Sequence, residues 1–305
     1  MKENAEVIEI NDKRYPKALK DALKNLIPSQ WPKKLYYKGN WPALSEVEGG
    51  GNIFKNCLAV VGSRHLTSYG RRATEQIVTE IAAAGITIVS GFMFGGDEAA
   101  HSSAVRCGGR TIAVMPCGID VIFPPQNKKL YEEILENNGL IISEYEGNFK
   151  PVNYSFVQRD RLVAGLAKAV FVTEAALGSG SLITANYAKK FGRKIFALPG
   201  QITSELSKGT IKLIKEGAEP VCEANDILSF YKVLVSQKRV AAAPAGATEK
   251  GSLEEKILDQ LCREPMKADD MARMFAVPVA QLGTALSLMQ LKGFINLDNG
   301  KYYIN

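Results

Sequence analysis

The chain has 305 residues, of which 46% are hydrophobic and 23% charged, a composition that suits a globular protein with one large domain and a small one. No apolar run reaches membrane length and the N-terminus, MKENAEVIEI, lacks the apolar core of a signal peptide, so we expect a cytoplasmic protein with no membrane partner. Two histidines and five cysteines without a CxxC pair argue against a metal site or a disulfide framework, and no cofactor is expected.

The net charge is +6, but its distribution says more than its size. Residues 252–305 contain six basic and seven acidic side chains, so the C-terminal part is not basic. A site for a polyanion therefore has to be a local cluster in the middle of the chain.

Residues 1–50 form a lead-in segment that we expect to pack on the main domain. The spacing of Leu19, Leu23 and Leu26 predicts a short amphipathic helix, and residues 35–37 predict a short extended piece. The glycines at 49–51 indicate a loop.

Residues 51–235 show the pattern of an α/β domain. Apolar runs at 57–62, 86–90, 111–115, 140–143, 169–173 and 194–198 alternate with helical patterns near 68–84, 97–107, 127–137, 156–167, 181–191 and 208–216. Runs that are continuously apolar indicate parallel strands covered on both faces. We therefore predict an extended Rossmann-like, doubly wound and mostly parallel sheet.

The C-terminal part reads as a linker followed by a small domain. Residues 236–251 are small, polar and contain Pro and Gly, as in a linker. Residues 252–305 show three helical patterns and then Asn299-Gly300 between two short β-like runs, which predicts a winged helix. Its third helix, 278–293, has one charged residue, Lys292, so we expect protein contact or packing and not duplex reading.

The first candidate site is the loop VVGSRHLTSYG, which joins a predicted strand to a predicted helix. It is not a GxGxxG dinucleotide motif. Gly62, Ser63, Arg64 and Thr67 could bind a phosphate, because a helix N-terminus offers unpaired N–H groups and arginine adds a bidentate grip. The alternative is helix capping with a surface salt bridge.

The second candidate is the loop before residues 181–191, again between a strand and a helix. Gly178, Ser179, Gly180, Ser181 and Thr184 could approach and donate to phosphate oxygens. The alternative is a flexible loop with a serine cap. The two loops end different strands of one sheet, where ligands of α/β proteins collect.

The third candidate is NYSFVQRDRLVAG, at the start of a predicted helix. Phe156 could stack on a base while Arg159 and Arg161 contact phosphates, the combination that binds single strands. The alternative puts Phe156 in the core and pairs the arginines with Asp160 and Glu144.

Asp97 and His101 are spaced i, i+4 and share a helix face. They could form a general-base pair, but no nucleophile elbow lies nearby. The favoured interpretation is that His101 hydrogen-bonds to Asp97 near the helix N-terminus and the two order the loop.

These segments, in this order, resemble the DprA/Smf DNA-processing family. The resemblance rests on YP…LYYKGN, VVGSRHLTSYG, SGFMFGGDEAAH, FVQRDRLVAGL and SGSLITANYAKKFGRKIFALPG. It implies a cytoplasmic protein, not an enzyme, that binds single-stranded DNA, loads a RecA-type recombinase during uptake of transforming DNA, and forms a homodimer through the Rossmann-like domain. It also implies a strand-binding pocket, carried over onto Arg64, Phe156, Arg159, Arg161 and Ser179–Ser181.

Three positions depart from the family pattern: Gly96 replaces Ile, Val157 replaces Pro, and Asp160 replaces Asn, adding a negative charge to a phosphate site.

Two other functions stay open. A nucleotide phosphoribohydrolase would carry the sequence Pro-Gly-Gly-x-Gly-Thr followed by a catalytic Glu. Residues 177–181 of this chain read LGSGS, with no acidic residue in the next helical turn, and so lack that pattern. A nucleotide sensor could use the same pocket.

Overall fold

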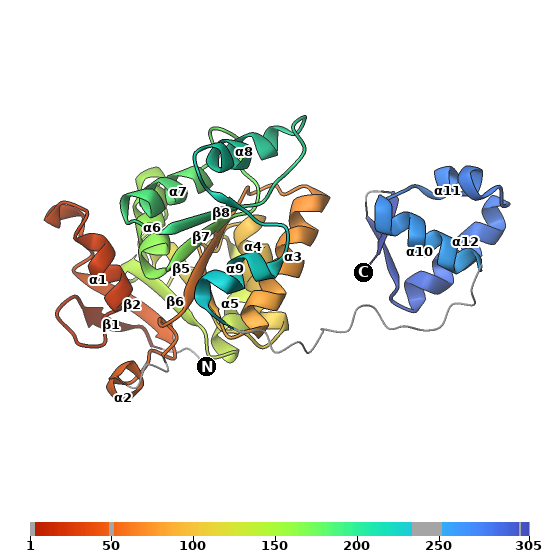
Figure 1. Ribbon diagram of the computed structural model, residues 1–305. Helices are drawn as coiled ribbons and strands as arrows, with labels where there is room; N and C mark the ends of the chain where they lie inside the picture. The colour runs from red at the N-terminus through yellow and green to blue at the C-terminus, as the bar shows by residue number, and fades with distance from the viewer. Residues whose placement is uncertain (1–3, 49–51, 234–251, 299, 305) are drawn as a thin grey trace. The chain divides into compact units, whose positions relative to one another are not determined.

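The computed structural model describes residues 4–48, 52–233, 252–298 and 300–304. It consists of two compact units, residues 1–234 and 235–305, which we describe separately (Figure 1). The predicted linker, 236–251, the glycines at 49–51 and Asn299 of the predicted turn lie outside the described residues.

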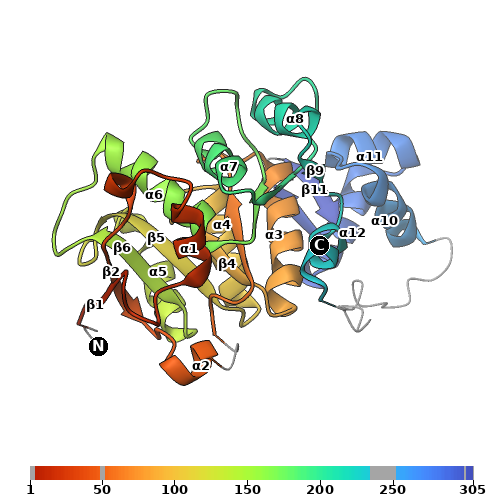
Figure 2. The ribbon, with the colours of Figure 1, turned by 60° about the vertical axis from the view of Figure 1, so that its left-hand side comes forward.

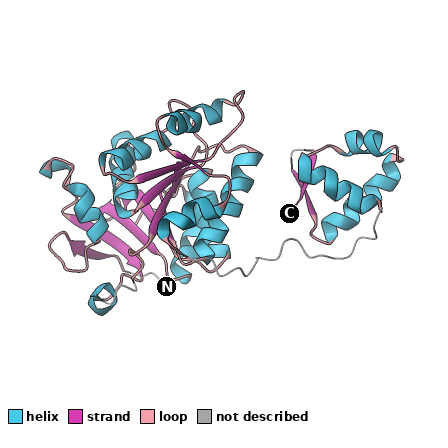
Figure 3. Ribbon diagram, viewed as in Figure 1, coloured by secondary structure: helices cyan, strands magenta, loops and turns pink. Residues whose placement is uncertain are grey.

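A nine-stranded sheet, in the order β1-β2-β6-β5-β4-β3-β7-β8-β9, forms the centre of the first unit (Figure 3). All neighbours from β6 to β9 are parallel, whereas β1 and β2 are antiparallel additions at one edge. The strands are β1 (Glu6–Glu9), β2 (Lys34–Gly39), β3 (Cys57–Val61), β4 (Thr87–Ser90), β5 (Thr111–Gly118), β6 (Leu140–Tyr145), β7 (Ala169–Val172), β8 (Lys194–Ala197) and β9 (Glu219–Pro220).

Helices cover both faces of this sheet (Figures 1 and 2). One face carries α1 (Lys17–Leu23), α6 (Asn153–Leu166) and α7 (Ser181–Lys190), which contact one another in that order. The other carries α3 (Ser68–Ala83), α4 (Gly96–Arg106), α5 (Lys128–Glu136) and α9 (Ala224–Tyr231). The unit also contains α2 (Leu44–Glu48) and α8 (Lys208–Lys215). The predicted doubly wound, mostly parallel α/β fold is confirmed.

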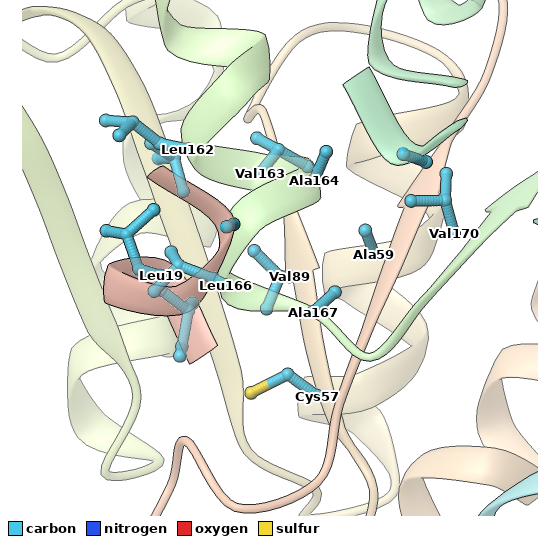
Figure 4. Packing of buried hydrophobic residues seen from close by; sticks show 14 of the residues in the cluster. Leu19, Cys57, Ala59, Val89, Leu162, Val163, Ala164, Leu166, Ala167 and Val170 are labelled. Atoms are coloured by element: carbon cyan, nitrogen blue, oxygen red, sulfur yellow. The ribbon is translucent and has the colours of Figure 1, made fainter. Parts of the chain in front are cut away.

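The core between the sheet and α6 explains why these strands are continuously apolar. All five residues of β3 are buried, because helices pack on both of its faces. Leu162, Val163 and Leu166 of α6 belong to the same buried cluster as Ala59 and Val170 of the sheet (Figure 4). Cys57 is a core residue of this cluster, whereas Cys222 is exposed.

The N-terminal segment extends the sheet. The predicted extended piece is β2, which pairs antiparallel with β6, with Tyr37 opposite Ile142. The predicted helix is α1, which packs on α6 at Gly165, where a Cβ would lie 2.6 Å from Cδ1 of Leu19. The sequence did not predict β1, in which Ile8 is the one buried residue.

The second unit has the predicted winged-helix elements: α10 (Leu253–Arg263), α11 (Ala268–Phe275) and α12 (Val279–Leu291), then a hairpin of β10 (Ile295–Asp298) and β11 (Lys301–Ile304). Its own core includes Ile257, Met271, Leu286 and Ile295. Among the described residues no single helix is long and apolar enough to cross a membrane; α11 and α12 reach that length only together, across a bend of 119°.

Candidate functional site

A cavity of about 580 Å³ lies where β3, β4 and β7 end, between α6 and α7. Its lining draws on all four segments that the sequence singled out. The candidate residues that line it are Gly62, Ser63, Arg64, Asp97, Phe156, Arg159, Gly178, Ser179, Gly180, Ser181 and Thr184. This is the edge of an open α/β sheet at which ligands collect, so the topology brings together loops that are more than 100 residues apart.

Two glycines set the shape of the loop after β3. A Cβ at Gly62 would lie 2.3 Å from Oγ1 of Thr173, and a Cβ at Gly96 would lie 2.6 Å from the Cα of Gly62. The start of α4 therefore touches the β3–α3 loop directly. This contact gives a physical reason for glycine at position 96, where the family pattern has isoleucine.

Arg64 and Phe156 form the polar and aromatic side of the cavity. The guanidinium carbon of Arg64 lies 5.3 Å from the centre of the Phe156 ring, a cation–π distance. Phe156 packs edge-on against Phe123, with ring centres 5.9 Å apart, and is half-buried. Arg64 itself is exposed, so its charge is available to a ligand in the cavity.

The opposite side of the cavity is the loop from Gly178 to Ser181, where α7 begins. The Ser179 hydroxyl lies 3.1 Å from the Ser181 hydroxyl and accepts from the Ser181 N–H at 3.3 Å. A Cβ at Gly178 or Gly180 would meet open space, so the backbone here is accessible. The N–H groups of both serines have partners within the loop, so the hydroxyls and the N–H groups of the two glycines are the ones that suit an anion.

Arg159 supplies a buried positive charge at the base of the cavity. Its side chain is 5% exposed, its Nη1 donates to the carbonyl of Val114 at 2.9 Å, and its Nε lies 3.2 Å from the carboxylate of Asp160. Burial raises the pKa of Asp97, and the nearby Arg159 charge opposes that rise. Asp97 accepts from the Met93 N–H at 3.1 Å and so holds the β4–α4 loop.

Asp160 is the unexpected group in this cavity. It lines the cavity with a side chain that is 14% exposed. Burial, with a contribution from the negative charge of Asp97, raises its pKa to about 6, although the charges of Arg159 and Arg64 oppose the shift. Part of the Asp160 population is therefore protonated at slightly acidic pH.

The structure gives Arg161 and Thr67 roles away from the cavity, since neither lines it. Arg161 forms a two-pronged pair with Glu144, at 2.7 and 2.5 Å, and its Nε donates to the carbonyl of Gln30 at 2.9 Å. Thr67 donates to Glu174 at 2.6 Å and caps α3 by accepting from the Gly70 N–H at 3.0 Å. Ion pairing and helix capping are the alternatives to phosphate binding that the sequence left open for these residues. The proposed binding surface therefore contains neither Arg161 nor Thr67.

The expected hydrogen bond between His101 and Asp97 is wrong. The Nδ1 of His101 lies 2.7 Å from the hydroxyl of Thr111, and no described residue partners its Nε2. His101 is fully buried and does not line the cavity, and burial lowers its pKa to about 3. It is therefore a neutral core residue that contacts the loop through the ring of Phe92, whereas Asp97 holds the loop by a hydrogen bond.

The predicted site residues did not include several others that lie in or near this cavity. His65 and Met93 line the cavity from loops that follow β3 and β4, and Asn153 and Val157 line it from α6. Tyr154 is 55% exposed one residue after Asn153. His65 and Met93 follow strand ends, and Asn153 lies one helical turn before Phe156, so their positions are the signal that could have found these three.

Comparison with known proteins agrees with the fold. The sequence model of DNA recombination-mediator protein A matches residues 6–232, and that of the DprA winged helix domain matches residues 241–301. Protein Smf of Synechocystis is 34% identical over 330 residues, covering 98% of this chain and 80% of that protein. The DNA processing protein DprA of Streptococcus pneumoniae is 39% identical over 201 residues, covering 66% of this chain and 67% of that protein.

Two solved structures are similar to this chain. The X-ray structure of DprA from Streptococcus pneumoniae has a TM-score of 0.64 at 36% identity and covers 75% of this chain and 74% of that one. The DprA of Helicobacter pylori, described for its single-stranded DNA binding mode, has a TM-score of 0.63 at 32% identity and covers 75% of this chain and 96% of that one. This chain therefore belongs to the DprA/Smf family of DNA-processing proteins.

Proposed function

We propose that this protein binds single-stranded DNA in the cavity at the carboxyl ends of β3 and β7. The observation that carries the proposal is the stacking of Arg64 on Phe156, opposite the open Gly178–Ser181 loop of the same cavity. Single strands are bound by this combination of charge for the phosphates and an aromatic face for the bases. Binding of single-stranded DNA by the Helicobacter pylori relative supports the proposal.

In this proposal one set of groups in the cavity binds the phosphates of the strand and another binds a base. Backbone phosphates bind to the N–H groups of Gly178 and Gly180, to the serine hydroxyls of the same loop and to the guanidinium of Arg64, because anions are favoured at a helix start and beside arginine. The ring of Phe156 takes a base. Arg159 supports the site from below, since its buried charge adds to the local positive potential.

Photocrosslinking tests this site directly. A strand of dT that carries one 5-iodouracil crosslinks to aromatic rings that stack on it. Because trypsin does not cleave before Pro151, we expect the crosslinked tryptic peptide to be residues 130–159, with the crosslink mapped by fragmentation to Tyr154 or Phe156. Crosslinks confined to residues 252–305 would contradict the proposed site.

We further propose that the protein binds and does not catalyse. His101 of α4 is buried away from the cavity, and the helix that begins at Ser181, SLITANYAKK, contains no acid. A phosphoribohydrolase would need an acid there. Incubation with nucleoside monophosphates tests this alternative: we expect no free base, and its release would favour the enzyme.

The finer parts of the role are also proposals: a cytoplasmic homodimer, formed through the Rossmann-like domain, that loads a RecA-type recombinase onto single strands during natural transformation or recombination. Family membership supports them. Light scattering should give twice the chain mass of 33.2 kDa. Strand exchange by a RecA-type recombinase, on DNA already coated by a single-strand-binding protein, should be faster when this protein is added.

A further inference from the structure

We propose that Asp160 makes the cavity selective for bases that carry an exocyclic amino group over thymine and uracil. The inference rests on the proposed function, because it concerns the base of a strand bound in this cavity. Asp160 lies one helical turn after Phe156 on α6, and both residues line the cavity, as does Val163 on the same helical face. A base held against Phe156 therefore has Asp160 within the same cavity.

The charged groups around Asp160 leave one of its oxygens free. On its own helix, Arg159 lies 3.2 Å from Oδ1; the β3–α3 loop contributes Arg64 and His65, and α4 contributes Asp97. Within the described part of the chain no donor is hydrogen-bonded to Oδ2 of Asp160. The 178–181 loop contributes hydroxyls but no charge. A carboxylate that is 14% exposed and lines a cavity needs a donor from whatever enters it.

Because the Asp160 carboxylate has an oxygen that lacks a hydrogen-bond donor among the described residues, it should favour bases that offer one. A carboxylate only accepts hydrogen bonds, and the amino group of cytosine is a donor that it can bind. Uracil and thymine present the O4 carbonyl at the same place, so their oxygen would face the carboxylate and be repelled. Stacking on Phe156 is nearly the same for cytosine and uracil, and it therefore adds no preference between them.

The test compares two strands in which cytosine, with its 4-amino group and acceptor N3, is exchanged for uracil, with its O4 carbonyl and N3–H. Fluorescence anisotropy at pH 8 would measure binding of an alternating dC-dT strand and of an alternating dU-dT strand of equal length. We expect wild type to bind the cytosine strand about fivefold more tightly, the value of one net hydrogen bond. In Asp160→Asn, whose amide both donates and accepts, we expect the two affinities to agree within about twofold.

A pH series on wild type gives the same information without a variant. Because burial raises the pKa of Asp160 to about 6, the preference should shrink between pH 8 and pH 5.5 as the carboxyl becomes protonated. Binding of the uracil strand should strengthen over the same range.

Equal affinities of wild type for the two strands at pH 8 would overturn the inference and leave the proposed function intact. A cytosine preference that survives in a folded Asp160→Asn would also overturn it. Failure of wild type to bind either strand would remove the proposed function, and the inference with it.

Discussion

The guanidinium of Arg159 lies directly against the Cα of Gly91, so that a Cβ at position 91 would be 1.7 Å from Nη1 of Arg159. Gly91 follows β4, and Arg159 reaches it from α6. The absence of a side chain at Gly91 thus creates the space in which the buried arginine donates to Val114.

Gly91→Ala should therefore destabilise the protein, because the added methyl group displaces a buried and paired guanidinium. We expect a loss of about 1–3 kcal/mol in the free energy of unfolding of the first unit. Urea denaturation followed by circular dichroism measures it. Gly178→Ala is the matched control, since its Cβ meets open space, and an equal loss in both variants would contradict the account.

Arg64→Ala should weaken binding of oligo-dT without destabilising the fold, since Arg64 is exposed. Losing one phosphate contact should also flatten the salt dependence by about 0.7 in the log–log slope. Arg106→Ala is the control: Arg106 is an exposed arginine in the last turn of α4 and does not line the cavity. Wild-type affinity and slope in Arg64→Ala would remove Arg64 from the site.

Arg159→Ala should weaken strand binding and lower stability together, unlike Arg64→Ala. Its removal leaves the carboxyls of Asp97 and Asp160 buried without their cation, and breaking a buried pair in this way costs about 3 kcal/mol. Thermal unfolding and anisotropy on the same preparation separate the two effects. Full stability of Arg159→Ala would contradict its buried, paired position.

Asp160→Asn should gain stability relative to wild type as the pH rises from 4 to 8. The pKa of Asp160 is raised to about 6 in the fold, above the 3.8 of an ordinary aspartate, so its contribution to stability is fully present below pH 3.8 and is lost as the pH rises through 6. Asparagine does not titrate. The gain should be about 2 kcal/mol larger at pH 8 than at pH 4, as measured by urea denaturation at both pH values.

Removing residues 235–305 should leave strand binding largely intact, because the residues that line the cavity all belong to the first unit. The first unit has its own core clusters, so the truncated chain should fold and show one cooperative thermal transition. Loss of most of the affinity in a folded truncation would show that the winged helix binds DNA.

The sequence predicted the fold well because most strands of the sheet are short, continuously apolar runs that can be recognised one by one. The apolar run at 57–61 is buried on both faces of the sheet, so its composition follows from its place in the core. The same reasoning brought together the loops that line the cavity, since the ends of parallel strands meet at one edge. It could not predict β1, because a four-residue strand with Ile8 as its one buried residue has no distinguishable pattern.

The individual side chains of the site were harder to assign. Arg159 and Arg161 are two positions apart on α6 and point to different sides of the helix, so one lines the cavity and the other pairs with Glu144. Helical geometry alone could have separated them. The partner of His101 could not be predicted, because Thr111 lies on a different element and the contact exists only in the folded chain.

The most direct test of strand binding is fluorescence anisotropy of a labelled oligo-dT strand, beside duplex DNA of equal length, over a series of salt concentrations. We predict tight binding of the single strand, a clear preference over the duplex, and a loss of affinity as salt rises. Equal affinity for strand and duplex, or no binding at low salt, would contradict the account and favour a small-nucleotide pocket instead.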